Sequence, residues 1–316
     1  MSRRDEQRLF RTSIGGQALI EGIMMRGPDK QAIVIRNSEG ELVEKVDEIN
    51  ALSKRHKFFR LPFIRGVVGF LGSMIMGVKA LMYSAEFVPE DEQEEPGKID
   101  KWIEEKFGWE KAQKYIVALA VVMAVALMVV MFILLPTFIA GLFDFIDMPN
   151  IMRNGIEGIV KIVIFTCYLW LIARLDDIKR VYQYHGAEHK TIHCYEKGLK
   201  LTVENVRVQP RQHPRCGTSF LFVVIIISII LVSFISWSNV WIRMVVRIAL
   251  LPVVVAISYE INRWVGRHDN LLSRILSAPG KAMQHLTTNE PDDSMIEVGI
   301  KALELVIPEK KGADAW

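Results

Sequence analysis

Three histidines recur at intervals of four in the middle of the chain, at His185, His189 and His193. At about 100° per residue, these side chains and that of Glu196 lie within an arc of about 80° on one face of a helix. Two histidines one helical turn apart can bind the same Zn²⁺, which is why helical metalloenzymes use this spacing. The segment therefore predicts a site for a divalent metal such as Zn²⁺, with His185, His189 and His193 as its ligands.

His185, Glu188 and His189 also match the H-x-x-E-H order of the inverted zincins. In those enzymes the two histidines hold the metal and the glutamate acts as a general base, so Glu188 is the predicted catalytic residue. Gly186 opposes this prediction, because glycine weakens a helix at the point where the ligands must be fixed. The candidates that would complete the ligand set are Glu21, His193, Cys216 and Glu260.

The histidine segment and a second group of possible ligands each have an alternative interpretation that involves no metal. The histidines and tyrosines of residues 182–197 are compatible with an interfacial helix that hydrogen-bonds lipid headgroups, loop carbonyls or a partner protein. A second group, His213, Arg215 and Cys216, precedes an apolar run and offers a soft metal ligand. Its alternative interpretation is an interfacial Arg215, a packed Cys216 and a solvated His213. The sequence leaves these alternatives open.

Several long apolar runs are among the elements that must position these residues. Residues 116–143 contain no charged side chain, over a length greater than the roughly 20 residues that cross a hydrocarbon core. Residues 155–173 and 218–241 are long enough to span with modest tilt. Residues 248–259 are shorter and need flanking residues, with an Arg or Glu that reaches the interface. The sequence therefore predicts about four transmembrane helices.

The distribution of positive charge sets the predicted orientation. Residues 173–214 hold eight Lys and Arg, whereas the short connectors 144–154 and 236–243 hold one Arg each. By the positive-inside rule the long middle segment is cytoplasmic, and four spans then place both termini in the cytoplasm. The predicted location is the bacterial inner membrane.

Residues 61–85 are apolar and rich in glycine, but we predict that they do not cross the membrane. Arg65 and Lys79 leave only 13 uncharged residues between them, which is short for a crossing. We expect a re-entrant or interfacial helix whose glycines, including Gly66 and Gly77, allow close packing on a neighbour. A fifth span with an odd topology is the alternative.

The remaining segments predict a small α+β cytoplasmic domain. Residues 32–35 and 41–46 alternate around a glycine-containing turn, as in a β-hairpin. Residues 201–208 have a β-like pattern, so we expect a sheet shared with the N-terminal segment, and residues 294–306 have the spacing of an amphipathic helix that packs on this domain. The predicted order is a cytoplasmic N-terminal segment (1–60), the re-entrant or interfacial helix (61–85), an acidic linker with a cytoplasmic helix (86–114), two spans (115–174), the His-rich segment (175–217), two spans (218–264) and a cytoplasmic C-terminal segment (265–316).

Composition narrows the classes of function. A net charge of +3 is too small to indicate a nucleic-acid partner. Three scattered cysteines predict free thiols and no disulfide framework. The polar, Arg-rich first 30 residues lack the apolar core of a cleavable signal peptide. With 51% apolar residues, the lipid bilayer is the predicted partner, alone or together with other membrane proteins.

Three stretches of the chain read GGQALIEGIMMRGP at 15–28, YHGAEHK at 184–190 and RCGTS at 215–219. Together they resemble the YqhQ family of bacterial membrane proteins. The resemblance extends over nearly the whole chain. The family is a domain of unknown function whose members are described as predicted metal-dependent enzymes. The resemblance therefore implies a metal-dependent activity carried by His185, Glu188 and His189.

Two functions are compatible with the sequence. The first is a metal-dependent enzyme, a hydrolase acting at the cytoplasmic face on a membrane-associated substrate. The second is a non-enzymatic factor for membrane-protein biogenesis, assembly or quality control, suggested by the glycine-rich helix and by the methionines of residues 74–82. A transporter is a weaker third, because the predicted spans carry few buried ionisable residues along a path. The sequence names neither the substrate nor the partner.

Overall fold

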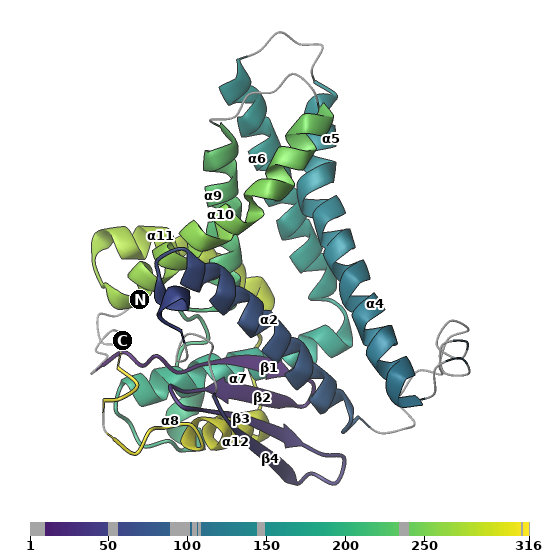
Figure 1. The fold of residues 1–316 in the computed structure, drawn as a ribbon. Helices are drawn as coiled ribbons and strands as arrows, with labels where there is room; N and C mark the ends of the chain where they lie inside the picture. Colours follow the sequence, from purple (N-terminus) through teal and green to yellow (C-terminus); the bar gives the residue numbers. More distant parts are fainter. Residues whose placement is uncertain are drawn as a thin grey trace. The chain divides into compact units, whose positions relative to one another are not determined.

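The computed structural model describes residues 10–49, 56–88, 102, 106, 109–143, 149–233, 240–310 and 312–315 (Figure 1). Most of the predicted acidic linker with its cytoplasmic helix (86–114), including residues 89–101, lies outside this described part. The chain folds as two compact units. Unit 1 comprises Met1–Val88, Tyr168–Ile227 and Pro252–Trp316, and unit 2 comprises Pro89–Cys167 and Ser228–Leu251. The predicted chemical residues therefore all belong to unit 1.

Unit 1 is built on a four-stranded antiparallel sheet whose strands follow chain order (Figure 1). The strands are β1 (Gly15–Leu19), β2 (Gly22–Arg26), β3 (Lys30–Arg36) and β4 (Leu42–Glu48). The predicted hairpin of residues 32–35 and 41–46 is confirmed as β3 and β4, in which Ile33 lies opposite Lys45. The turn between them requires glycine at Gly40, where φ is 84°.

Helices cover both faces of this sheet, because apolar side chains occupy both sides of β2 and β3. α7 (Asp176–Glu196) and α12 (Asp293–Glu304) pack on one face, and α2 (Ile64–Ala85) packs on the other. The side chains that share a core with α7 and α12 are Ile23, Met25, Ala32 and Val34. Those that share a core with Ala80 of α2 are Leu19, Met24, Ile33 and Ile35. Because side chains alternate between the two faces along each strand, one set of apolar side chains packs against the histidine-bearing α7 and holds it on the sheet.

The prediction of a strand at residues 201–208 is wrong. This stretch contains the short helix α8 (Val203–Arg207), whose first turn is capped by the side chain of Thr202. Val206 is fully buried and shares a core cluster with Ile296 of α12. A short run of branched apolar residues suits either a strand or a helix, so the contact with α12 decides the outcome here.

Two further helices of unit 1 follow in the C-terminal segment. The predicted amphipathic helix at residues 294–306 is confirmed as α12. α11 (Leu271–Thr287) begins with a capping box, in which Asn270 and Ser273 bond each other's backbone N–H. Directly after α11, the N–H of Asn289 donates to the carbonyl of Tyr182 at 2.8 Å. α11 therefore ends beside α7.

Among the residues that the structure describes, four helices are long and apolar enough to cross a membrane, and they indicate a membrane protein. The segments are Ile64–Ala85, Tyr115–Gly141, Met152–Ile172 and Met244–Arg267. The last three correspond to the spans predicted at 116–143, 155–173 and 248–259. The span predicted at 218–241 corresponds to α9 (Gly217–Ser233), an apolar helix of 17 residues. Residues 234–239 of that prediction lie outside the described part of the chain.

α2, the helix predicted to be re-entrant or interfacial, is one continuous helix of 22 residues that follows the 3-10 helix η2 (Lys57–Arg60). Its glycines allow close packing, since a Cβ added to Gly66 would lie 2.9 Å from the Cβ of Tyr259. The guanidinium of Arg65 forms an ion pair with Glu260, with Nε 2.7 Å from Oε1. α2 is therefore joined to a helix from the C-terminal half of the chain.

Unit 2 contains apolar helices around a buried polar cluster. Its elements are α4 (Trp109–Val129), the π-helical turn η4 (Val130–Leu134), α5 (Leu135–Gly141) and parts of α6 (Asn150–Ile172), α9 and α10 (Val240–Arg267). Arg247 pairs with Glu157 at 2.5 Å and donates to Thr137, while Lys161 donates to Ser228 at 3.2 Å. Glu157, Lys161 and Arg247 are each at most 7% exposed. The expectation of few buried ionisable residues in the spans is therefore wrong.

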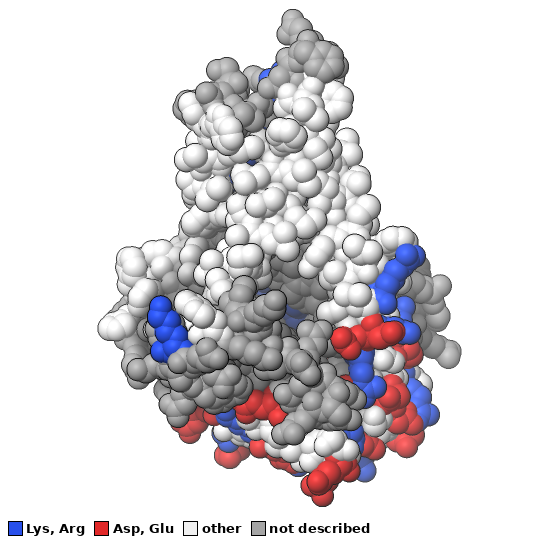
Figure 2. Space-filling model, turned by 90° about the vertical axis from the view of Figure 1, so that its right-hand side faces the viewer, with Lys and Arg blue, Asp and Glu red and all other residues white. Residues whose placement is uncertain are grey.

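The two units differ in the charge of their surfaces. Figure 2 shows Lys, Arg, Asp and Glu gathered over the strands of unit 1, where Glu44 and Lys45 of β4 are exposed. The helices of unit 2 show few charged side chains on this face. Large apolar side chains are exposed on α4, among them Val122 and Met123. Such an uncharged helical surface suits hydrocarbon better than water.

Candidate functional site

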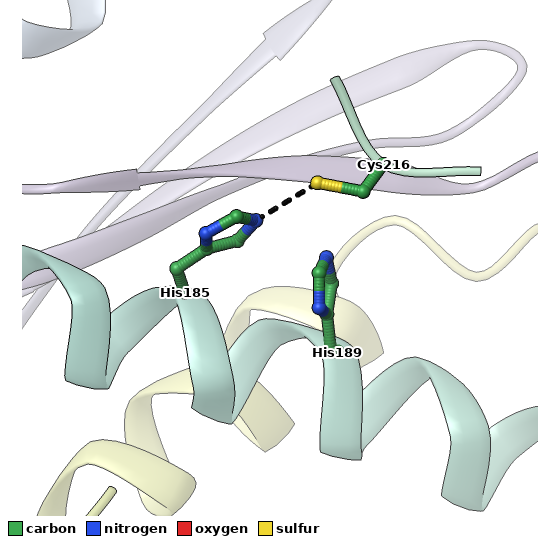
Figure 3. Close-up of side chains that lie close together, drawn as sticks. All are labelled: His185, His189 and Cys216. Atoms are coloured by element: carbon green, nitrogen blue, oxygen red, sulfur yellow. Dashed lines mark hydrogen bonds between the residues drawn. The ribbon is translucent and has the colours of Figure 1, made fainter. Parts of the chain in front are cut away.

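Two histidines and one cysteine converge in unit 1. His185 and His189 project from one face of α7, and Cys216 comes from the segment just before α9 (Figure 3). Their metal-ligating atoms all lie within 4.8 Å of one another. Nε2 of His185 lies 3.1 Å from Sγ of Cys216. Of the four candidates for a further ligand, Cys216 is therefore the one that the fold brings to this pair.

Backbone carbonyls hold both imidazole rings in place. Nδ1 of His185 lies 2.8 Å from the carbonyl oxygen of Thr287, and Nδ1 of His189 lies 2.5 Å from that of Arg211. A carbonyl oxygen can only accept, so each Nδ1 carries the proton that it donates. In a neutral ring this leaves the lone pair on Nε2, the atom by which His185 meets Cys216. Metal-binding histidines are commonly oriented by a hydrogen bond of this kind.

The electrostatic environment of Cys216 favours the thiolate. Burial alone would raise the pKa of this thiol, but the charges and hydrogen bonds of His185 and His189 lower it well below its usual value. For His185, burial lowers the pKa, yet the interaction with Cys216 raises it to about 9. The thiolate is the form of cysteine that binds metals and acts as a nucleophile.

Glu188 lies between these histidines in the sequence and is buried in the fold. Its Oε1 accepts a hydrogen bond from the N–H of Gly16 at 3.1 Å, whereas its buried Oε2 has no hydrogen-bond partner in the described part of the chain. Burial raises the pKa of this carboxyl group, against the opposing effect of His185 and His189. Close approach of β1 to α7 requires glycine, because a Cβ on Gly16 would lie 2.9 Å from Cδ of Glu188.

A cavity of about 670 Å³ opens at this group of residues. His185, Glu188, His189 and Cys216 all line it. Arg26 at the end of β2 lines it as well. The buried polar groups therefore face a space large enough for a small-molecule ligand, since such sites commonly have about 300–1,000 Å³.

Comparison with known proteins places the chain in a family. A family model described as "Protein of unknown function (DUF1385)" matches residues 61–309. The chain is 33% identical over 296 residues to "Uncharacterized protein YqhQ" of Bacillus subtilis (strain 168), which covers 91% of this chain and 90% of that protein. The chain belongs to the DUF1385 family. The resemblance to the YqhQ family is thereby confirmed, and no solved structure matches the chain.

His193, predicted as the third ligand, belongs to a different group in this DUF1385 chain. It lies with Glu196 and His213, and the ligating atoms of these three are also within 4.8 Å of one another. Arg215 forms an ion pair with Glu196 and already supplies a positive charge there. Nε2 of His193 lies 2.8 Å from the carbonyl oxygen of Gln212. This second group therefore braces the segment that carries Cys216.

The two remaining candidates of the DUF1385 sequence lie in neither group. Glu21, which has a φ of 51°, pairs with Arg180 and accepts from the hydroxyl of Tyr184 at 3.1 Å. Glu260 pairs with Arg65 of α2. Both carboxylates are therefore engaged by a guanidinium, and neither is positioned as a ligand beside His185.

Sequence reasoning missed the residue that fixes the Cys216 segment in this DUF1385 fold. Gln284 of α11 accepts from the N–H of His213 at 2.7 Å, and donates to the carbonyl of His213 at 2.7 Å and to the hydroxyl of Ser219 at 2.9 Å. It is fully buried. A single glutamine in an amphipathic helix carries no signal of such a role, because its partners lie about 70 residues away along the chain.

Proposed function

We propose that the chain is a metal-dependent hydrolase at the cytoplasmic membrane face, with His185, His189 and Cys216 as ligands and Glu188 as general base. The observation that carries the proposal is the orientation of both imidazoles by backbone carbonyls, which aims Nε2 of His185 at Cys216 within hydrogen-bond distance. Zn²⁺ binds histidine nitrogens and cysteine thiolates, and catalytic Zn²⁺ sites use three protein ligands and keep a fourth position open. The set is thus suited to Zn²⁺.

The residues around the three ligands have separable roles in this proposal. When bound, Zn²⁺ supplies a Lewis acid that activates water and polarises a carbonyl or phosphoryl oxygen. Gly16 holds one oxygen of Glu188, and the other oxygen, Oε2, is unpaired and available to accept a proton. The carbonyl groups of Thr287 and Arg211 fix the orientation of the two histidine rings.

Elemental analysis of the purified full chain tests whether these residues bind Zn²⁺. The wild type is expected to carry near-stoichiometric Zn²⁺ after metal-replete purification, and His185→Ala/His189→Ala and Cys216→Ala are each expected to lose most of it. His268→Ala is the matched control, because His268 is exposed and stacks on Trp264, away from the cavity lining. Metal absent from the wild type, or metal equally present in all four proteins, would overturn the assignment.

Glu188→Gln separates catalysis from binding. The amide keeps the shape of the carboxylate but cannot accept a proton as a base, so turnover should fall at least about 10²-fold while Zn²⁺ stays bound. Release of product from ester and phosphate-ester probes, measured beside metal content, gives both readouts. Loss of metal and turnover together, or of neither, would count against the role of Glu188.

A second candidate activity uses the same residues without a metal. The 3.1 Å contact between Nε2 of His185 and Sγ of Cys216, with Thr287 orienting the ring, is also the arrangement of a cysteine nucleophile with its base. Chelation discriminates between the two activities. A cysteine nucleophile retains its turnover after metal removal, whereas the metal-dependent hydrolase loses it and recovers it when Zn²⁺ is restored.

We further propose an inner-membrane protein with about four spans, cytoplasmic termini and an interfacial α2. The C-terminal end of α2 supports this, since Ala80 packs on the sheet and the Nζ of Lys45 lies 4.4 Å from the ring centroid of Tyr83. A helix that shares its core with a charged domain is not centred in hydrocarbon. Thiol labelling of single cysteines placed at the exposed polar positions Ser73 and Lys79 tests it: accessibility at both from the cytoplasmic side is expected, and burial of both in lipid contradicts it.

The biogenesis factor stays a prediction. Exposed apolar side chains of α2, such as Leu71 and Ile75, favour it, because such a surface also suits a partner helix. Purification from native membranes tests it. Stoichiometric membrane-protein partners that persist in His185→Ala, together with an absence of metal in the wild type, would favour this function over the hydrolase.

A further inference from the structure

We propose that the cavity beside His185, His189 and Cys216 takes an anionic amphiphile, whose phosphate or carboxylate group pairs with Arg26 and whose apolar chain leaves along α2, α6 and α9. This inference deepens the function proposed above and rests on it for the reacting groups. Both features of the ligand, its anionic group and its apolar chain, have a counterpart in the lining of one cavity of about 670 Å³.

One wall of this cavity is apolar and comes from helices suited to a membrane. Met76 of α2, Leu169 of α6 and Leu221 of α9 line it. α2 and α6 are each long and apolar enough to span, and α9 is a shorter apolar helix. Leu221 is 42% exposed, so the apolar wall continues from the cavity to the outside of unit 1. A hydrocarbon chain can follow this wall without entering water.

Arg26 supplies the positive charge that the ligand requires. It ends β2 and lines the same cavity. The guanidinium groups of Arg65, Arg180 and Arg215 each pair with a glutamate, whereas that of Arg26 has no ion-pair partner in the described part of the chain. Burial lowers the pKa of Arg26, which reflects the cost of leaving this charge without a partner. An anionic headgroup offsets that cost and forms charge-assisted hydrogen bonds.

The combination excludes simpler ligands. A fully water-soluble substrate would leave Met76, Leu169 and Leu221 in contact with water, and an uncharged lipid would leave Arg26 unpaired. The buried, unpaired Oε2 of Glu188 in the same cavity marks the end at which the reaction takes place. The ligand therefore has its reactive bond near its anionic head and its chain toward the membrane.

Native mass spectrometry of the full chain in detergent measures this preference. The probes are short-chain phosphatidic acid and phosphatidylcholine added in equal amounts, with inorganic phosphate in a parallel sample. Wild type is expected to retain phosphatidic acid about tenfold over phosphatidylcholine, a difference of about 1.4 kcal/mol. Arg26→Gln should abolish the preference, and Arg207→Gln, which removes an exposed arginine paired with Asp293, should leave it intact. Leu221→Trp places a larger side chain on the apolar wall and narrows the cavity, so it should lower the retention of both lipids.

The outcomes separate the ligand from the metal. Equal retention of the two lipids by wild type, or a preference unchanged in Arg26→Gln, overturns the proposal. Inorganic phosphate retained through Arg26 as well as phosphatidic acid identifies a site for free phosphate and also overturns it. Wild-type lipid preference in the His185→Ala/His189→Ala variant supports the ligand even where the metal assignment fails. Bound metal without any lipid preference overturns the ligand alone.

Discussion

Replacing Arg247 by methionine leaves the carboxylate of Glu157 without its partner inside unit 2. The two side chains lie 2.5 Å apart and are 6% and 5% exposed, so neither charge is compensated by water. Breaking one member of a buried pair destabilises proteins by about 3–5 kcal/mol, because the other charge remains desolvated. Arg247→Met is therefore expected to lower the free energy of unfolding by about 3–5 kcal/mol. The lost hydrogen bond to Thr137 is part of this figure.

The double variant Glu157→Met/Arg247→Met tests whether the loss of stability comes from the buried charge left without a partner. Removing both charges removes both of their desolvation penalties, but it also withdraws the carboxylate that attracts the buried Lys161. The double variant should therefore be more stable than Arg247→Met alone and less stable than wild type. Tryptophan fluorescence during unfolding in mixed SDS micelles measures these values, since the chain has seven tryptophans. Arg174→Met, which removes an exposed arginine stacked on Trp170, should cost under about 1 kcal/mol. A double variant as unstable as the sum of its single variants would refute the reasoning.

Three further predictions concern unit 1. Gly186→Ala should lower stability by at least about 1–3 kcal/mol, because its Cβ would lie 2.1 Å from the carbonyl oxygen of Asn289; thermal unfolding measures this. Gly16→Ala should cut turnover while keeping bound metal, because its Cβ displaces Glu188, and paired metal and activity assays check it. Burial raises the pKa of Tyr182 to about 12, so the unfolded chain releases this proton first and stability should fall as pH rises from about 10 toward 12. Unfolding measured from about pH 10 to about pH 12 tests the prediction for Tyr182, and a stability that does not change over this range would contradict it.

Periodicity was sufficient to find the face of α7 but not the site. An interval of four residues put His185 and His189 together on one helix face, as the geometry of any helix requires. Cys216 lies 27 residues beyond His189 in the sequence, and only the folded segment before α9 brings it to the pair. His193 has the same spacing, but it lies one turn beyond His189 and therefore beside different residues, Glu196 and His213.

Two local rules pointed the wrong way because a tertiary contact outweighed them. Gly186 weakens a helix by its own propensity, but α7 passes so close to Asn289 that a Cβ there would lie 2.1 Å from the carbonyl oxygen. The sequence suggested few buried ionisable residues in the spans, but Glu157 and Arg247 neutralise each other across two helices. Pairing between distant residues is the information that composition and periodicity do not carry.

The proposed metal ligands and the groups that hold them come from stretches far apart in the order of synthesis. Gly16 is made before His185 and His189, and Thr287, whose carbonyl orients His185, is made about 100 residues after them. The apolar helices that precede α11 are translated, and available to the insertion machinery, before that carbonyl exists. If the site binds a metal as proposed, we expect loading to follow insertion of these helices. The metal content of a preparation would then report how much of it had completed folding, as distinct from how much had reached the membrane.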